Sequence, residues 1–506
     1  MKHDSRSSMK RKFLCLALAL GMALAAGAQD LKDIEKRVTE FTLANGLHFI
    51  VFERRQAPVV SFHTFVNAGS VNDPGGQTGI AHMFEHMAFK GTDTIGTRSY
   101  EEEKKALEAV EEVYDRLEAE RNKGPRADGD KVRALELELK VAVDRANSYV
   151  EPNMLPQIIE QNGGVGLNAS TGADSTNYHY SLPANRLELW FLLESERFQR
   201  PVFREFYKER DVVREERRMR IESHPQGRLL ETLLAAAFAA HPYRNSPAGW
   251  ASDIESLRAG DAARFFRVHY APANIAIGIA GDVNSGEARR LAEKYFGGLP
   301  KAAQPAGVRT AEPKQEGEKR VKVESPSQPF LLVGYKRPDQ LHADDAALDV
   351  LQGILSGGRT GLLYKELVRD KKLALAAAAQ AAFPGAKYTS LFVFFVAPSL
   401  DRTTEENEKA IYEILEKLKQ EKVEAATLDR VKTKVRASVV RALDNNAGMA
   451  MRLTYYHVNY GNWRKLFTGL DEINKVMAED VQRVVRQYFV ESGRTVAYSV
   501  KLGAAK

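Results

Sequence analysis

Hydrophobic and polar positions along this chain follow two patterns, which predict strands followed by helices in each half. Near the N-terminus, two strand-like runs flank Asn45-Gly46, the dipeptide most typical of a two-residue hairpin turn. A further strand over residues 274–283 leads to a helix that ends near Gly297. The same order recurs later, with strands over 330–335 and 390–396 and helices from Asp344, Thr403 and Ala426. We therefore expect an α+β fold made of two related halves.

Composition indicates where these halves begin and end. Residues 301–318 consist mainly of Ala, Pro, Gln, Gly and charged residues, as is typical of a linker. The length favours more than one domain, and we expect an N-terminal domain over 29–300 and a C-terminal domain over 319–506. Residues 1–28 show the basic, apolar and small-residue zones of a signal peptide, and the apolar run is too short to span a membrane. We expect an exported protein without a membrane span, most simply in a bacterial periplasm.

Charge and cysteine content exclude some classes of function. Five Lys/Arg and one Asp lie in residues 1–28, so the remaining chain carries a formal charge of only +2. Because no tract of a single charge sign is present, we expect no nucleic-acid partner. The only cysteine, Cys15, lies in the apolar run of the signal peptide, so no disulfide is expected after cleavage.

Residues 100–156 predict a helical hairpin inserted into the first half. The segment is rich in Glu, Lys, Leu and Ala and is interrupted by a turn-like stretch at 122–129. Its first arm carries four apolar residues at helical spacing, which indicate a packing seam: Ala106, Val110, Val113 and Leu117. We favour a structural elaboration, and a gate that restricts access to a binding site remains the alternative.

The sequence His82-Met83-Phe84-Glu85-His86 predicts a catalytic zinc site. On a helix the two histidines lie on one face, about 6 Å apart along the axis, so both imidazoles can reach one ion. Glu85 shares that face and is placed to take a proton from a metal-bound water instead of binding the metal. This arrangement is the inverted form of the zincin motif.

A third protein ligand is expected because catalytic zinc sites use three and leave one position for water. Residues 203–222 predict a helix whose inward face carries Glu209, Val212, Val213, Glu216 and Met219. Glu215 falls on the charged outer face, so Glu216 is assigned as the third ligand. Glu209 lies about 10 Å earlier along the axis, which suits a residue that orients a ligand instead of binding the ion.

These motifs resemble those of the insulinase/pitrilysin family of zinc peptidases, which includes the mitochondrial processing peptidases. The resemblance rests on Gly69-Ser70, the segment from Gly79 to Thr92 around the histidines, and the helix from Glu209 to Glu216. It selects the same Glu216 as the helical phase does. It implies two α/β-sandwich halves that face each other across a cleft, with one Zn²⁺ per chain in the first half. Residues 167–171 resemble the family's edge strand, which implies that Asn168 and Ala169 bind an extended substrate.

The C-terminal half departs from the family pattern at two positions. The family carries an Arg and a Tyr seven residues apart that assist the reaction, whereas the matching positions here are Val368 and Leu375. Arg369 replaces the missing Arg only if the alignment shifts by one residue. We therefore expect a heterodimer with a zinc-less sister subunit that supplies the Arg and the Tyr, with a homodimer as the alternative.

The favoured function is a zinc endopeptidase that hydrolyses extended peptides or unfolded protein segments, with Glu85 as the base for zinc-bound water. A zinc-binding subunit of weak or no activity that binds peptides for a partner is the main alternative, and a metal-free chaperone-like clamp is a third. The other histidines considered are expected to be ordinary packed or exposed residues: His63, His179, His224, His241, His269, His342 and His457.

Overall fold

The computed structural model describes residues 34–501 and contains two mixed β-sheets. The signal peptide predicted over 1–28 lies outside these residues. The strands of the first sheet are β1 (Val38–Thr42), β2 (His48–Glu53), β3 (Val59–Val66), β4 (Val165–Thr171), β5 (Thr176–Pro183) and β6 (Ile275–Gly281). They pair in the order β1-β2-β6-β3-β5-β4, with β4 at one edge. Only β2 and β6 pair in parallel.

The second sheet repeats this arrangement without a counterpart of β1. Its strands are β7 (Lys319–Ser325), β8 (Leu331–Arg337), β9 (Ala374–Phe383), β10 (Ser390–Pro398) and β11 (Arg494–Lys501). They pair in the order β7-β11-β8-β10-β9, and again one parallel pair, β7 with β11, precedes a run of antiparallel pairs. The expected α+β class with two related halves is therefore confirmed.

The β1–β2 hairpin shows how a local turn sets a sheet edge. Gly46 has a φ of +99°, which favours glycine, and a Cβ there would lie 2.9 Å from the Cβ of Ala273. The Asn45 side chain accepts a hydrogen bond from the Leu47 amide and donates one to the Phe296 carbonyl. The turn is thereby fixed to the body of the first half.

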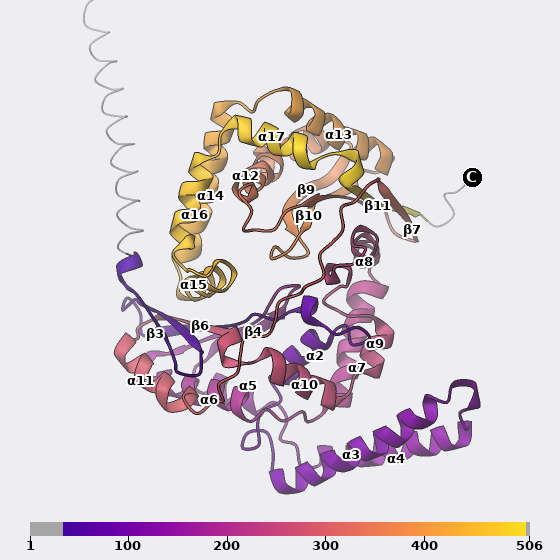
Figure 1. The fold of residues 1–506 in the computed structure, drawn as a ribbon, viewed down its shortest axis with the longest axis vertical. Helices are drawn as coiled ribbons and strands as arrows, with labels where there is room; N and C mark the ends of the chain where they lie inside the picture. Colours follow the sequence, from indigo (N-terminus) through magenta and orange to yellow (C-terminus); the bar gives the residue numbers. More distant parts are fainter. Residues whose placement is uncertain (1–33, 502–506) are drawn as a thin grey trace, which may run out of the picture.

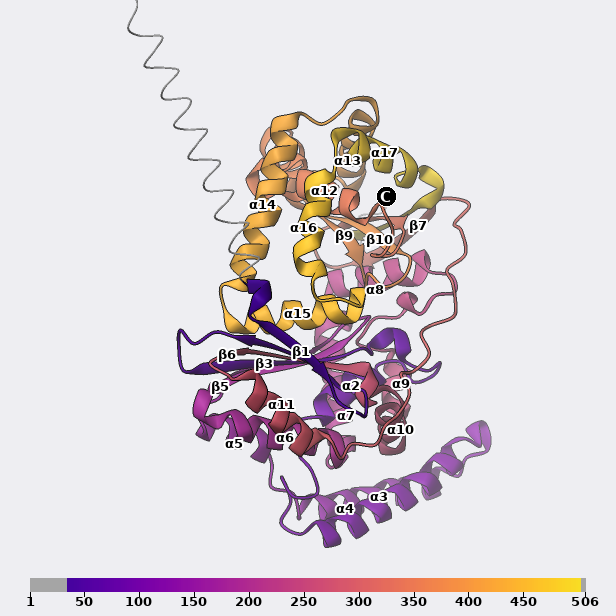
Figure 2. The same ribbon diagram turned by 60° about the vertical axis from the view of Figure 1, so that its left-hand side comes forward.

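Most helices of the first half lie on one face of its sheet (Figure 2). They are α2 (Ile80–Met87), α5 (Met154–Gln161), α6 (Leu187–Gln199), α7 (Phe206–Arg217), α9 (Ala251–Ser256), α10 (Ala259–His269) and α11 (Ser285–Phe296). Trp190 and Phe191 of α6 are fully buried in the core between these helices and the sheet. The Trp190 ring stacks on Phe62 of β3, with ring centroids 4.4 Å apart. Aromatic packing of this kind fixes α6 against the sheet.

The helices of the second half are α12 (Asp345–Ser356), α13 (Thr404–Gln420), α14 (Ala425–Leu443), α15 (Asn446–Tyr460), α16 (Lys465–Lys475) and α17 (Ala478–Tyr488). Each half also places one helix on the sheet of the other (Figure 1). Helix α8 (Pro225–Ala237) of the first half packs on β11 and β7, whereas α15 packs on β6 and β3. A Cβ at Gly278 of β6 would lie 2.5 Å from the Ala450 carbonyl oxygen, so glycine permits the close approach of α15. This exchange holds the halves together.

Residues 100–147 form a pair of helices that projects from the first half (Figures 1 and 2). The pair consists of α3 (Tyr100–Arg121) and α4 (Gly129–Asn147). The four residues of the expected packing seam, Ala106 to Leu117, are buried. At the base, buried Arg204 donates to Glu103 of α3 at 2.7 Å and to the Thr92 carbonyl at 2.6 Å. The pair is thus anchored beside the loop that follows the zinc motif.

Residues 301–318 contain no helix or strand and connect α11 to β7. Within residues 34–501, no helix is both long and apolar enough to cross a membrane.

Candidate metal centre

Helix α2 holds both histidines of the motif and begins at a buried carboxylate. Asp73 accepts hydrogen bonds from the Gly79 amide at 2.7 Å and the Ala81 amide at 3.1 Å. Amides at the start of a helix have no partner inside it, so Asp73 caps the N-terminus of α2 from six residues before Gly79. Burial raises the pKa of Asp73 to about 8. The apolar side of α2 is buried in the core and consists of Ile80, Ala81, Met83, Phe84 and Met87.

The opposite side of α2 presents His82 and His86 to Glu216 of α7. The Nε2 atoms of His82 and His86 lie 3.8 Å and 3.4 Å from Glu216 Oε2. In a tetrahedral site with bonds of about 2.1 Å, donor atoms lie about 3.4 Å apart, so the spacing suits zinc. The two rings are nearly perpendicular, at 85°, with centroids 4.9 Å apart. Burial, followed by the charge of His86, lowers the pKa of His82 to about 4, which keeps its imidazole in the neutral form that binds metal.

Glu216 lies in the last turn of α7, just before a π-helical turn. Arg220 donates to Glu216 Oε1 at 2.7 Å, which leaves Oε2 toward the histidines. Glu215 is exposed and pairs with Arg218, as the helical phase predicted. The prediction that Val212 and Met219 face inward is wrong, since 46% and 55% of their surfaces are exposed. A π-helical turn over Arg218–Glu222 changes the phase at Met219, and of the adjacent pair Val212 and Val213 only the latter is buried.

Glu209 contacts His86 on the side away from Glu216. Its Oε1 lies 2.9 Å from His86 Nδ1, and Lys90 donates to its Oε2 at 2.6 Å. Burial acts to raise the pKa of Glu209, but the bonds from His86 and Lys90 outweigh it and lower the pKa to about 2. Burial likewise opposes ionisation of His86, yet the bond to Glu209 raises its pKa. An ionised carboxylate on Nδ1 fixes the tautomer that leaves Nε2 unprotonated toward Glu216.

Glu85 connects the motif helix to the edge strand. The Thr171 hydroxyl, at the end of β4, donates to Glu85 Oε2 at 2.5 Å. Burial raises the pKa of Glu85, and this hydrogen bond acts in the opposite direction. The carboxylate therefore lies between the His82–His86 pair and the strand, where it can exchange a proton with a group held between them.

Asn168 and Ala169 lie on β4, which pairs only with β5 in this sheet. Asn168 is exposed, and its side-chain oxygen accepts a hydrogen bond from the Ala169 amide at 2.9 Å. A strand edge without a neighbour offers backbone groups to an added strand.

Two family models match successive parts of this sequence. "Insulinase (Peptidase family M16)" matches residues 49–114 and 141–249, and "Peptidase M16 inactive domain" matches residues 256–435. The chain belongs to peptidase family M16. It is a zinc protease of this family, with His82, His86 and Glu216 as the candidate zinc site.

Individual M16 relatives extend this similarity over nearly the whole chain. "Zinc protease PqqE" of Helicobacter pylori is 28% identical over 98% of this chain and 99% of its own length. A solved protease from Helicobacter pylori has a TM-score of 0.76 and 26% identity, over 92% of this chain and 99% of the other. "Probable mitochondrial-processing peptidase subunit beta" of Arabidopsis thaliana is 23% identical over 92% of this chain and 79% of its own.

The second M16 half contains the two positions at which the family pattern has Arg and Tyr. Val368 is half-buried against the core of that half, and 66% of the Leu375 surface is exposed at the start of β9. Arg369 is also exposed, and its guanidinium binds Asp370, the next residue, at 2.6 Å and 2.8 Å. Neither apolar side chain offers a hydrogen-bond donor.

One further group of residues in this M16 chain has no signal in the sequence. Glu40, His48 and His457 lie close enough together to hold a metal ion. The sequence predicts that His457 is an ordinary packed or exposed residue, and it does not predict that the His457 ring stacks on His48. No local motif signals this group, because its members come from segments more than 400 positions apart.

Proposed function

We propose that this chain is a zinc-dependent endopeptidase that cleaves extended peptides or unfolded segments at the His82–His86–Glu216 site. The observation that carries the proposal is the position of Glu85, which shares the motif helix with the histidines and accepts a hydrogen bond from Thr171 of the edge strand. The base and the zinc ligands thus adjoin the strand on which a peptide can be aligned.

The donor set suits zinc, since two imidazoles and one carboxylate form a common catalytic ligand set. When bound there, Zn²⁺ supplies a Lewis acid that polarises the scissile carbonyl and acidifies a water molecule. His82, His86 and Glu216 hold the ion, and Glu209 fixes the His86 ring. Glu85 accepts the proton from the attacking water and later donates it to the leaving amine. Asn168 and Ala169 align the substrate backbone.

A peptide-digestion assay tests this proposal directly. Glu85→Gln preserves the size and polarity of the side chain but removes the base, so turnover is expected to fall at least about a hundredfold. The variant is expected to keep its zinc, measured by metal analysis of the purified protein, and the wild-type chain in excess chelator provides the inactive control. Hydrolysis by Glu85→Gln at the wild-type rate would show that another group acts as the base.

The alternative function is a zinc-bearing subunit that needs a partner for full activity. Val368 and Leu375 support it, because losing one donor to the developing oxyanion commonly costs about a hundredfold or more in rate. The Arabidopsis relative is itself named a subunit, which accords with this alternative. We propose a heterodimer with a zinc-less sister that carries Arg and Tyr seven residues apart.

Co-purification with such a sister subunit distinguishes the two possibilities. The heterodimer is expected to cleave peptides at least about tenfold faster than this chain alone, as expected when a missing donor is restored. Replacing the sister's Arg and Tyr by Val and Leu, the residues found here, provides the matched control. Equal rates with and without the sister would favour an enzyme that is complete alone or as a homodimer.

A periplasmic location is part of the proposal. It rests on the signal-like pattern of residues 1–28 and on the likeness in fold to the periplasmic protease PqqL from Escherichia coli. Fractionation of cells that produce the full-length chain tests it, and recovery of the uncleaved chain in the cytoplasm would contradict it.

A further inference from the structure

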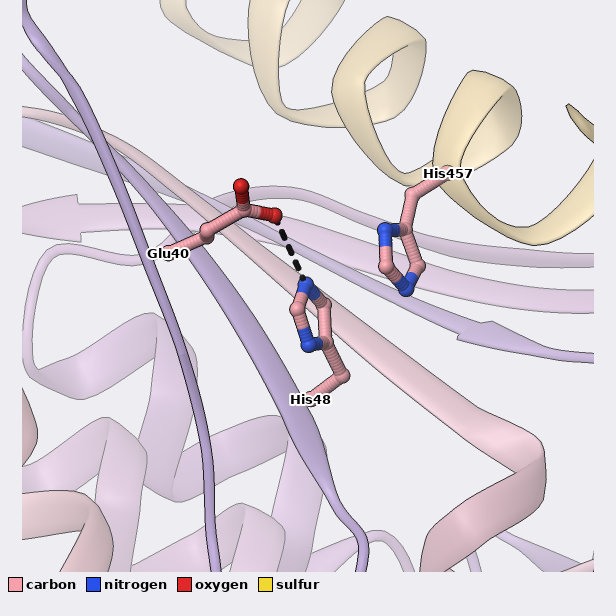
Figure 3. Close-up of side chains that lie close together, drawn as sticks. All are labelled: Glu40, His48 and His457. Atoms are coloured by element: carbon pink, nitrogen blue, oxygen red, sulfur yellow. Dashed lines mark ion pairs between the residues drawn. The ribbon is translucent and has the colours of Figure 1, made fainter. Parts of the chain in front are cut away.

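A second group of metal-ligating side chains lies where helix α15 covers the β1–β2 strand pair. Glu40 comes from β1, His48 from β2 and His457 from α15, and Figure 3 shows the three side chains close together. One ligand atom of each lies within 4.8 Å of the others. The group joins the start of the first half to a helix of the second half, across more than 400 positions of sequence.

His48 is oriented as metal-binding histidines usually are. Its Nδ1 lies 2.9 Å from the Thr42 hydroxyl, and its Nε2 lies 3.5 Å from Glu40 Oε2. With the proton on Nδ1 donated to Thr42, the lone pair of Nε2 points toward the carboxylate. That Nε2 atom is buried, and Glu40 Oε2 at 3.5 Å is too distant for a hydrogen bond of normal length. A buried nitrogen without a partner is unfavourable unless something binds it.

His457 supplies a second nitrogen in the same state. Its Nδ1 is also buried and lacks a hydrogen-bond partner within residues 34–501. The His457 ring stacks on His48 with centroids 3.7 Å apart and planes 5° apart. Parallel rings do not direct their lone pairs at one point, so one ring has to turn for both to bind the same ion. His457 is the ring that turns, because no hydrogen bond at Nδ1 opposes the rotation, whereas Thr42 holds His48.

The surrounding charges permit a cation. Arg464 donates to Glu40 Oε1 at 3.0 Å and to Glu35 Oε1 at 3.1 Å, so its charge is shared by two carboxylates and Glu40 Oε2 stays directed at His48. Burial, with the neighbouring His457, lowers the pKa of His48 to about 4, and burial also lowers the pKa of His457.

We propose that Glu40, His48 and His457 form a second metal site, which binds a divalent transition-metal ion such as Zn²⁺. Two imidazoles and one carboxylate favour zinc, copper or nickel over magnesium and calcium, which prefer oxygen ligands alone. The ion connects α15 to the β1–β2 pair, and so links the two halves of the chain. Because these ligands are not gathered in the unfolded chain, the bound ion stabilises the folded one.

Metal stoichiometry tests the proposal. Chelator-treated protein without a histidine tag is titrated with Zn²⁺ in a calorimeter, and the wild-type chain is expected to bind two ions. His457→Gln is expected to bind one. His269→Gln is the matched control, because His269 is another half-buried histidine of low pKa that lies outside both groups, and it is expected to bind two. One ion in the wild type, or two in His457→Gln, would overturn the proposal.

Thermal unfolding in a background without the motif site gives a second test. His82→Ala is expected to retain the second ion, so added Zn²⁺ should raise its Tm by a few degrees. The double variant His82→Ala/Glu40→Gln is expected to lose that rise. Glu40 lies near the surface, with 35% of its side chain exposed, so the chain is expected to fold with glutamine at this position. An equal rise in the double variant would contradict the assignment of the ligands.

Discussion

The two His-His-Glu groups of this protein differ in how their donors are brought together. In the motif site, both histidines lie on one helix, with their rings at 85° and with both Nε2 atoms within 4 Å of the same Glu216 oxygen. In the second group, the donors come from β1, β2 and α15, and the rings are parallel at 5°. Local helical geometry therefore prepares the first site before an ion arrives, whereas the second requires a ring to turn. We expect the motif site to bind Zn²⁺ more tightly.

The largest expected effect is the loss of Zn²⁺ from the motif site while the second site keeps its ion. Glu216→Ala removes the one carboxylate in the motif group, so its Zn²⁺ should be lost and peptide hydrolysis should fall to the level measured in chelator. The second site should keep its ion. Metal analysis together with the digestion assay measures both outcomes, with Glu215→Ala as the matched control because that neighbour is exposed and pairs with Arg218. Two bound ions in Glu216→Ala would show that the ligand set is wrong.

The sequence revealed the motif site because its information is local. Helical periodicity alone predicts that His82 and His86, four residues apart, lie on one helix face. It also predicts that Glu216 lies on the same face as Val213, which is buried. The same periodicity failed at Met219, where the π-helical turn begins to alter the phase. Whether Glu209 approaches His86 from the correct side depends on how α7 packs against α2, and the sequence could give only its distance from Glu216.

The second group had no such local signal. His48 and His457 meet because α15 of one half packs on the sheet of the other, and Gly278 permits that approach. The two-half α+β class was predictable from the repeated order of strands and helices. The exchange of α8 and α15 between the two sheets was not, because it depends on which apolar faces meet across more than 80 positions of sequence.

A smaller effect is expected from the carboxylate that orients His86. Glu209→Gln retains the size of the side chain but removes its negative charge, and loss of such a partner typically lowers metal affinity or activity about tenfold to a hundredfold. Competition with a chelator of known affinity measures the change at the motif site, while the second site should be unaffected. Glu205→Gln is the control, since Glu205 shares Lys90 with Glu209 but makes no contact with His86 in the structure. An equal loss in both variants would attribute the effect to Lys90.

The smallest expected effect concerns the hydroxyl that orients His48. Thr42→Val keeps the branched shape of the side chain and removes its hydrogen bond with His48 Nδ1. This hydrogen bond joins two neutral groups and is exposed to solvent. A neutral hydrogen bond contributes about 1 kcal/mol, so Zn²⁺ affinity at the second site should fall about fivefold, less than for the charged partner of His86. Titration in the His82→Ala background isolates this site. Glu209 orients His86 in the motif site, and Thr42 orients His48 in the second site. If Thr42→Val lowered Zn²⁺ affinity as much as Glu209→Gln does, that result would contradict the view that only the motif site is prepared before an ion binds.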